Sequence, residues 1–350
     1  MEKIMMKGNE ALAEGAIRAG CRFFSGYPIT PQNEVPEYMS RRMPEVGGVF
    51  LQAESEVSAI NMIYGAGGAG GRTMTSSSSP GISLKQEGIS YIACAQVPCV
   101  IANVSRGGPG LGGLTSSQSD YFQATKGGGH GDYHLIVFAP GTVQEMVDLV
   151  CLAFDKADEY RNPAMILTDA TMGQMMEPVV LPEMREAQKA NKPWATTGMK
   201  NRKQNLINSL GILGEDMVRI NQELQAKYRK IEENEVRYAT EDVDNADLVV
   251  VAYGTSSRIA RSAINLARKE GKKVGLFRPI TLWPFPRQPL AELAATADGK
   301  KFLVVEMSAG QMVEDVILST GDRSKVDFFG VMNGAIPTVR EVYNKIMEVL

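Results

Sequence analysis

The sequence NEALAEGAIRAGCRFFSGYP, residues 9–28, decides the class of fold. Apolar residues recur at helical spacing over residues 9–20, and the short apolar run CRFF, residues 21–24, follows them. The next four residues, SGYP, have the composition of a turn. This order predicts a helix that leads directly into a β-strand.

The alternation of helix and strand continues along the first half of the chain. Strand-like runs lie at residues 48–52, 72–77, 98–105, 135–139 and 164–168, and helical patterns lie at residues 55–66 and 143–160. Strands that alternate with helices predict a parallel sheet covered by helices on both faces, which is a doubly wound α/β domain.

Residues 177–241 interrupt this alternation with three prolines, a polar stretch and a charged helix at about residues 215–234. Beyond them, residues 247–253, 273–277, 301–306 and 326–330 are apolar strand candidates separated by helix-like segments. We therefore predict an N-terminal α/β domain over residues 1–185, a helical connector over residues 186–241 and a second, smaller α/β domain over residues 242–350.

Composition and charge exclude several classes of protein. The chain has 350 residues, of which 44% are hydrophobic, so it can bury the cores of two domains. Its net charge of −3 and its pI of about 5.7 lack the basic excess that nucleic acid or an anionic membrane surface requires. No apolar run approaches the roughly 20 residues that span a bilayer, and the start MEKI does not resemble a signal peptide. We expect a cytoplasmic protein.

The four cysteines, Cys21, Cys94, Cys99 and Cys151, occur singly in apolar surroundings and form no Cys-x-x-Cys pair. Iron–sulfur clusters need runs of such ligands. The pattern therefore predicts reduced, packed cysteines and no metal cluster held by this chain.

Few residues suit hydrolysis or dinucleotide binding. The chain has only two histidines and no Gly-x-Ser-x-Gly elbow, so a hydrolase triad has little to build on. Two Gly-x-Gly-x-x-Gly patterns occur, at residues 65–70 and 108–113. The first follows a helix rather than a strand, and Pro109 interrupts the second, so a nucleotide-dependent dehydrogenase is the weaker hypothesis.

Polar residues follow the predicted strands, where doubly wound sheets place their ligands. They are Thr30, Glu56, Ser76–Ser79, Arg106, and Gln118 with Asp120. Each also has a purely structural explanation: Thr30 as a turn residue, Glu56 as a carboxylate facing the helix dipole, and Arg106 as a surface cation.

Several motifs resemble those of one enzyme family, the alpha-type subunits of 2-oxoacid:ferredoxin oxidoreductases, and in particular its VorB-like 3-methyl-2-oxobutanoate (2-oxoisovalerate) oxidoreductase subunits. They are, in chain order, GYPITP (residues 26–31), ESE (54–56), TSSSSPG (75–81), RGGPG (106–110) and QSD (118–120). YGT (253–255) and RPITLWP (278–284) resemble the transketolase C-terminal type of domain. The resemblance covers nearly the whole chain.

The resemblance implies a subunit of a thiamine diphosphate-dependent enzyme whose residues 1–181 bind the aminopyrimidine ring of the cofactor. Glu56 matches the family's carboxylate that hydrogen-bonds N1′ of that ring, and a carboxylate can share a proton where an amide cannot. Tyr27, Pro28, Ser76 and Ser77 would line the cofactor. Thr30, Arg106 and Gln118 would bind the substrate, with the planar fork of Arg106 on its carboxylate.

The same resemblance implies an enzyme that is active only with partner subunits. A beta-type subunit would hold the diphosphate and Mg²⁺, and iron–sulfur and gamma-type subunits would hold [4Fe-4S] clusters that pass electrons to ferredoxin. Coenzyme A (CoA) would take the acyl group as co-substrate. In agreement, the sequence contains no Gly-Asp-Gly motif for magnesium.

The substrate and the role itself leave alternatives. The stretch GPGLG, residues 108–112, supplies no hydroxyl after Arg106. This favours a branched, apolar 2-oxo acid such as 3-methyl-2-oxobutanoate, with 2-oxoglutarate or pyruvate as the alternatives. A nucleotide-dependent dehydrogenase and a non-catalytic assembly protein are rivals from other classes, and the presence of Thr30, Glu56 and Arg106 counts against the second.

Overall fold

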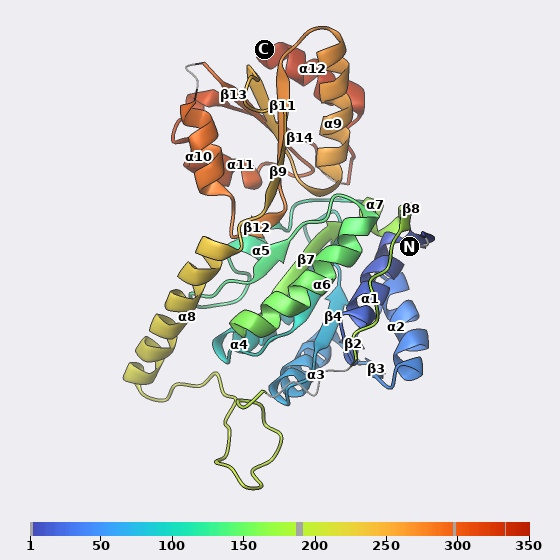
Figure 1. Cartoon of the computed structure of the whole chain (residues 1–350), viewed down its shortest axis with the longest axis vertical. Helices are drawn as coiled ribbons and strands as arrows, with labels where there is room; N and C mark the ends of the chain where they lie inside the picture. Colours follow the sequence, from blue (N-terminus) through green and yellow to red (C-terminus); the bar gives the residue numbers. More distant parts are fainter. Residues whose placement is uncertain (1–2, 187–191, 297–298, 333) are drawn as a thin grey trace.

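Two α/β units are stacked along the long axis of the molecule in the computed structural model (Figure 1). The structure describes residues 3–186, 192–296, 299–332 and 334–350. Within these residues, none of the helices combines the length and the hydropathy needed to cross a bilayer.

The first unit is built on a seven-stranded sheet in the order β12-β6-β7-β5-β4-β2-β3. All neighbouring strands are parallel except β12, which pairs antiparallel with β6. The strands are β2 (Phe23–Gly26), β3 (Val49–Gln52), β4 (Thr73–Ser77), β5 (Val100–Ser105), β6 (Ile136–Phe138), β7 (Ala164–Asp169) and β12 (Thr281–Trp283). Every residue of β4, β5 and β7 is buried, as expected of a parallel sheet covered on both faces.

Helices cover this sheet in two groups, because α1 packs against α2 and α6, whereas α3 packs against α4. Figure 1 shows α1 and α6 in front of the sheet. The helices are α1 (Gly8–Arg18), α2 (Glu34–Glu45), α3 (Glu56–Gly68), α4 (Ser79–Cys94), α5 (Tyr121–Thr125), α6 (Val143–Tyr160) and α7 (Ala170–Gln174). A short antiparallel ribbon of β1 (Ile4–Lys7) and β8 (Met176–Val179) lies beside them.

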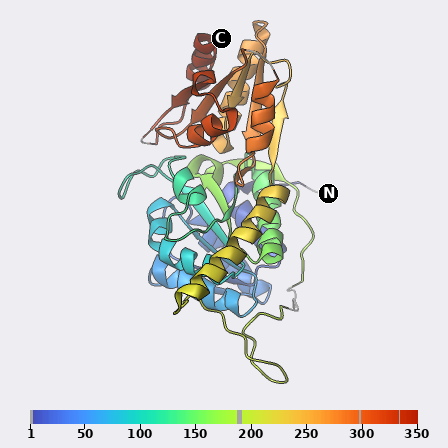
Figure 2. The same ribbon diagram turned by 90° about the vertical axis from the view of Figure 1, so that its left-hand side faces the viewer.

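The long helix α8 (Gly214–Asn234) crosses the outside of the first unit, as Figure 2 shows. It is anchored by Tyr228, whose ring meets those of His134 and Trp283 edge to face. Lys227 adds a hydrogen bond of 3.1 Å from its Nζ to the backbone oxygen of Arg161. The charged helix predicted at residues 215–234 is therefore present, packed along one side.

The second unit contains a five-stranded sheet in the order β14-β13-β10-β11-β9, parallel except for β9. Its strands are β9 (Tyr238–Glu241), β10 (Leu248–Val251), β11 (Val274–Pro279), β13 (Lys301–Glu306) and β14 (Val326–Gly330). Its helices are α9 (Gly254–Lys269), α10 (Arg287–Ala295), α11 (Met312–Thr320), the single turn η1 (Arg323–Lys325) and α12 (Val339–Val349). Helix α9 packs against α12, and α10 packs against α11.

Two strands pair with a sheet that lies on the other side of a predicted domain boundary. Strand β9, at the end of the predicted connector, belongs to the second sheet, whereas β12, from the second predicted domain, extends the first sheet. Strand β12 has three residues and precedes Pro284, so no periodicity marks it. The boundaries at residues 185 and 241 remain predictions.

Candidate functional site

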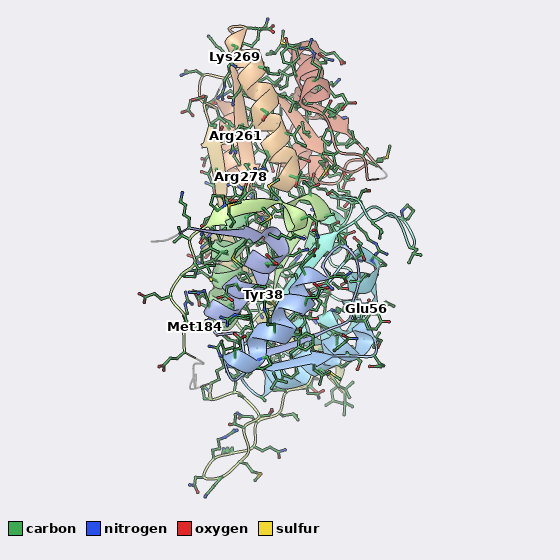
Figure 3. All side chains as sticks on the ribbon, turned by 90° about the vertical axis from the view of Figure 1, so that its right-hand side faces the viewer. Tyr38, Glu56, Met184, Arg261, Lys269 and Arg278 are labelled. Carbon is green, nitrogen blue, oxygen red and sulfur yellow. The ribbon has the colours of Figure 1, made fainter. Side chains whose placement is uncertain are left out.

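Glu56, labelled in Figure 3, is the first residue of α3. Only 6% of its surface is exposed. Ser55 caps the helix, because its hydroxyl accepts a hydrogen bond of 3.2 Å from the backbone N–H of Ser58. The carboxylate thus lies at the positive end of the helix dipole. By contrast, Glu54 lies before the helix and is exposed.

Strand β4 and helix α4 close around this carboxylate. A Cβ on Gly81, in the first turn of α4, would lie 2.7 Å from Oε1 of Glu56 and would collide with the hydroxyl of Ser77. Glycine at this position therefore lets α4 approach both groups. The Oγ atoms of Ser77 and Ser78 are buried and have no hydrogen-bond partner among the described residues. Buried hydroxyls without partners are unusual, and they fit a polar ligand beside Glu56.

Ser76 differs from its neighbour Ser77, because its hydroxyl is hydrogen-bonded to the buried side chain of Gln32. Gln32 comes from the loop after β2 that also contains Tyr27, Pro28 and Thr30. These three residues are exposed in the single chain, with 37% of Tyr27 accessible. Four of the predicted cofactor-binding residues, Tyr27, Pro28, Ser76 and Ser77, thus come from the ends of the neighbouring strands β2 and β4.

Arg106 directly follows β5 and is 5% exposed, so it is not a surface cation. Its Nη1 donates to the backbone oxygen of Thr30 at 2.8 Å, and its Nη2 donates to that of Leu111 at 2.7 Å. The guanidinium therefore joins the loop after β2 to the glycine-rich loop after β5. Its Nε is buried without a partner in the described part of the chain, so donors remain available.

A hydrogen-bonded cluster supports the same loops. Ser79 Oγ donates to Oδ2 of Asp120 at 2.7 Å and accepts from the backbone N–H of Arg106 at 2.9 Å. Asn103 Nδ2 also donates to Oδ2 of Asp120, at 2.8 Å. Asn103 was not among the site residues predicted from the sequence, although it is a polar residue within the buried, largely apolar run VIANVS.

Gln118 lies between the two units rather than beside Arg106. Its Nε2 donates to the backbone oxygen of Tyr253 at 2.9 Å, and its Oε1 accepts from Ser256 Oγ at 2.7 Å and from the backbone N–H of Met307 at 3.0 Å. These bonds hold the second unit against the first. The predicted contact of Gln118 with substrate stays a prediction.

A cleft of about 490 Å³ opens between the two units next to the glycine-rich loop. Residues that line it include Ser79, Pro80, Asp120, Gln311 and the stretches 107–110 and 307–309. No group of three or more His, Cys, Asp or Glu side chains suited to a metal ion occurs among the residues that the structure describes. The buried carboxylate of Glu56 and the buried, unpartnered hydroxyl of Ser77 fit the uncharged pyrimidine end of a cofactor.

Comparisons with known proteins agree with this geometry. Residues 14–245 match the family model "Pyruvate flavodoxin/ferredoxin oxidoreductase, thiamine diP-bdg", and residues 246–342 match "Pyruvate:ferredoxin oxidoreductase core domain II". Fold and site together define a thiamine diphosphate-binding α/β protein. The ketoisovalerate oxidoreductase subunit VorB of Methanothermobacter thermautotrophicus is 52% identical over 99% of this chain and 97% of its own length. The chain belongs to the family of 2-oxoacid:ferredoxin oxidoreductase subunits, which confirms the family predicted from the motifs.

More distant relatives match as well, by sequence or by structure. The 2-oxoglutarate synthase subunit KorA of Methanocaldococcus jannaschii is 37% identical over 90% of this chain and 91% of its own. A solved 2-oxoglutarate:ferredoxin oxidoreductase from Magnetococcus marinus, with 2-oxoglutarate, coenzyme A and succinyl-CoA bound, superimposes with a TM-score of 0.87 at 27% identity. This chain covers 65% of that solved chain, with 99% of its own length aligned. A split-gene transketolase at 15% identity, with a TM-score of 0.62, shares the fold.

Proposed function

We propose that this chain is the subunit of a 2-oxoacid:ferredoxin oxidoreductase that holds the aminopyrimidine ring of thiamine diphosphate. The observation that carries the proposal is the buried carboxylate of Glu56 at the start of α3, facing the unpartnered hydroxyl of Ser77. The reaction is the CoA-dependent oxidative decarboxylation of a 2-oxo acid to an acyl-CoA. When bound, thiamine diphosphate supplies the carbon nucleophile and the electron sink for loss of carbon dioxide.

In this proposal Glu56 hydrogen-bonds N1′ of the pyrimidine and moves a proton to and from that atom. Its position at a helix start favours the negative charge that remains when the proton is on the ring. Its near-complete burial keeps water from competing for that proton. Ser77 supplies a hydroxyl beside it, while Tyr27 and Pro28 cover the exposed side of the ring.

Arg106 and Thr30 orient the substrate. A hydrogen bond from the guanidinium to the backbone oxygen of Thr30 holds the two residues together. The free N–H donors of the guanidinium pair with the carboxylate of the 2-oxo acid. The glycine-rich loop after Arg106 surrounds the substrate tail without hydroxyl groups, which suits a branched apolar chain. Identity of 52% with a ketoisovalerate subunit, against 37% with a 2-oxoglutarate subunit, supports 3-methyl-2-oxobutanoate as substrate.

The remaining components come from partner subunits in the cytoplasm. The diphosphate and its Mg²⁺ bind to a beta-type subunit, and [4Fe-4S] clusters in iron–sulfur and gamma-type subunits carry electrons to ferredoxin. The test is purification of the chain with its neighbouring subunits and assay of viologen reduction. We expect the highest kcat/KM with 3-methyl-2-oxobutanoate. If kcat/KM is higher with 2-oxoglutarate or pyruvate, that acid is the substrate instead.

Glu56→Gln in the assembled enzyme is expected to lower turnover by roughly a hundredfold or more, because an amide cannot move the proton. Subunit assembly, measured by size-exclusion chromatography, should be unchanged. Glu54→Gln is the matched control, since Glu54 is exposed two residues away. Near-wild-type activity of Glu56→Gln would make Glu56 a helix-terminal carboxylate and overturn the proposed role.

A further inference from the structure

Lys85 is a buried cation close to Glu56 that the proposed function leaves unused. It belongs to α4 and is 0% exposed. Its Nζ donates to Oγ1 of Thr75 at 2.7 Å and to the backbone oxygen of Ser76 at 3.0 Å, both on β4. An ammonium carries three N–H donors, so one remains without a partner in the described part of the chain.

Lys85 lies one helical turn along α4 from Gly81, the residue at which α4 approaches Glu56. Gly81, Lys85 and Gly88 lie at i, i+4 and i+7, which is one face of α4. At the two ends of this face, a Cβ on Gly81 would meet Glu56, and a Cβ on Gly88 would lie 2.5 Å from Cγ2 of Ile60, one turn along α3. Lys85 therefore belongs to the helix face that contacts α3.

The electrostatics agree with this position. Burial lowers the pKa of Lys85 to about 7, and the negative charge of Glu56 opposes that shift. Among the described residues, Glu56 is the charged group that acts on the pKa of Lys85. Strand β4 contributes only the Thr75 hydroxyl and the Ser76 carbonyl. Burying an ammonium without a direct ion pair lowers the stability of the folded protein. A lysine kept at such a position therefore points to a functional role.

We propose that Lys85 is a positioning residue for Glu56, whose buried ammonium stabilises the carboxylate as an anion when the proton lies on the pyrimidine. This inference rests on the proposed function, in which Glu56 contacts the cofactor. Lys85 itself transfers no proton. The alternative is that Lys85 only ties α4 to β4, in which case it affects stability alone.

The experiment uses the assembled enzyme and measures hydrogen–deuterium exchange at C2 of bound thiamine diphosphate, per cofactor bound, across pH 6–9. We expect Lys85→Met to slow exchange roughly tenfold or more, as for loss of a group that assists proton transfer. The wild-type rate should fall as the pH rises through the pKa of Lys85. Arginine stays charged across this pH range, so Lys85→Arg should exchange as fast as the wild type does at low pH, and its exchange rate should not fall as the pH rises.

Lys227→Met is the matched control, because burial also lowers the pKa of Lys227 to about 7 and its Nζ likewise bonds a backbone oxygen, far from Glu56. It should leave the exchange rate and its pH profile unchanged. In a Glu56→Gln background, Lys85→Met should add no further loss, since Lys85 acts through Glu56. Additive losses would overturn the inference.

Failure of the inference and failure of the proposed function give different results. If Glu56→Gln exchanges at the wild-type rate, the proposed function is wrong and the inference falls with it. If Glu56→Gln abolishes exchange while Lys85→Met behaves like Lys227→Met, the inference alone is wrong. If Lys85→Met does not assemble, Thr75→Val is the substitute variant, because it removes one acceptor of the ammonium. Loss of this acceptor should lower the pKa of Lys85, so the exchange rate should begin to fall at a lower pH. An unmoved profile would overturn the inference.

Discussion

At the scale of single residues, Arg106 has both a structural and a proposed functional role. From the sequence alone, Arg106 could be either a surface cation or a ligand of the substrate. The structure shows a buried guanidinium that joins the loop of Thr30 to the loop of Leu111. Substitution of Arg106 will therefore disturb loops as well as any bound carboxylate, and a test must separate the two effects.

A neutral substrate analogue separates them. Arg106→Ala should cost the reaction of 3-methyl-2-oxobutanoate on the order of 2–5 kcal/mol, because a buried carboxylate loses its partner. Arg106→Lys should also raise KM and lower kcat, since an ammonium cannot reproduce the bidentate fork. The matching aldehyde has no carboxylate, so both variants should lose much less activity with it than with the acid, and that smaller loss measures the disturbance of the loops alone. Equal losses for acid and aldehyde would mean that Arg106 only supports the loops.

The buried Lys85, the partly buried Lys227 and two buried cysteines predict an unusual pH dependence of stability. Burial lowers the pKa of Lys85 and of Lys227 from 10.5 to about 7, so the unfolded chain binds more protons between these values. The free energy of unfolding should therefore rise with pH above about 7. Burial raises the pKa of Cys21 and Cys99 from 9.0 to about 12, so above pH 9.0 these thiols act in the opposite direction.

We expect a maximum of stability near pH 9 in urea unfolding monitored by circular dichroism. Lys85→Met should make the free energy of unfolding rise less steeply below this maximum, because methionine does not titrate and adds nothing to the pH dependence. Cys21→Ala should weaken the fall above it. A steady decrease in stability from pH 7 upward would show that the lysines are not desolvated as their burial indicates.

At the scale of helices and strands, the sequence predicts long periodic elements well and short ones poorly. Helix α6 has the predicted bounds, residues 143–160, because Thr142 caps its start and Arg161, at φ 48°, ends it. Strand β12 and the ribbon of β1 and β8 were missed, since three or four residues carry no clear period. Such short strands are defined by the partner with which they pair.

The same limit applies to the site. Turn and motif residues such as Thr30, Glu56 and Arg106 stand out in the sequence because they follow predicted strands. Lys85 does not, since a lysine inside a helix usually faces solvent. The hydrogen bonds of Gln118 to the second unit join residues more than a hundred positions apart. Contacts of this kind depend on how the units pack, which no local pattern encodes.

The contact between α3 and α4 allows a direct test of element packing. A Cβ on Gly88 would lie 2.5 Å from Cγ2 and 3.3 Å from Cβ of the buried Ile60, so Gly88→Ala should lower the free energy of unfolding by roughly 1–3 kcal/mol. Gly65→Ala on α3 is the control, because no atom beyond the neighbouring backbone of its own helix lies within 4 Å of its Cβ position. It should raise stability by roughly 0.5–1 kcal/mol. Equal effects of the two substitutions in thermal unfolding would contradict the close packing.

At the scale of the whole molecule, the proposed function gives this chain one end of a cofactor site. The described residues present a carboxylate and buried hydroxyls for the pyrimidine but no cluster of ligands for the metal of the diphosphate. We expect the isolated chain to bind thiamine diphosphate weakly, because the contacts to its charged end are missing. Isothermal titration calorimetry of the single chain, with the assembled enzyme as reference, measures this. A micromolar Kd for the single chain would contradict the prediction.

The insertion of β12 into the first sheet has a consequence for how the chain is made. Strand β6 has β7 on one side and gains its other neighbour only from residues 281–283. At ordinary translation rates, the ribosome needs on the order of ten seconds to extend the nascent chain from β6 to β12. Until then β6 is an open edge, which is the feature of a sheet that recruits foreign strands. Synthesis is therefore the period in which pairing of β6 with a strand of another chain is most favoured.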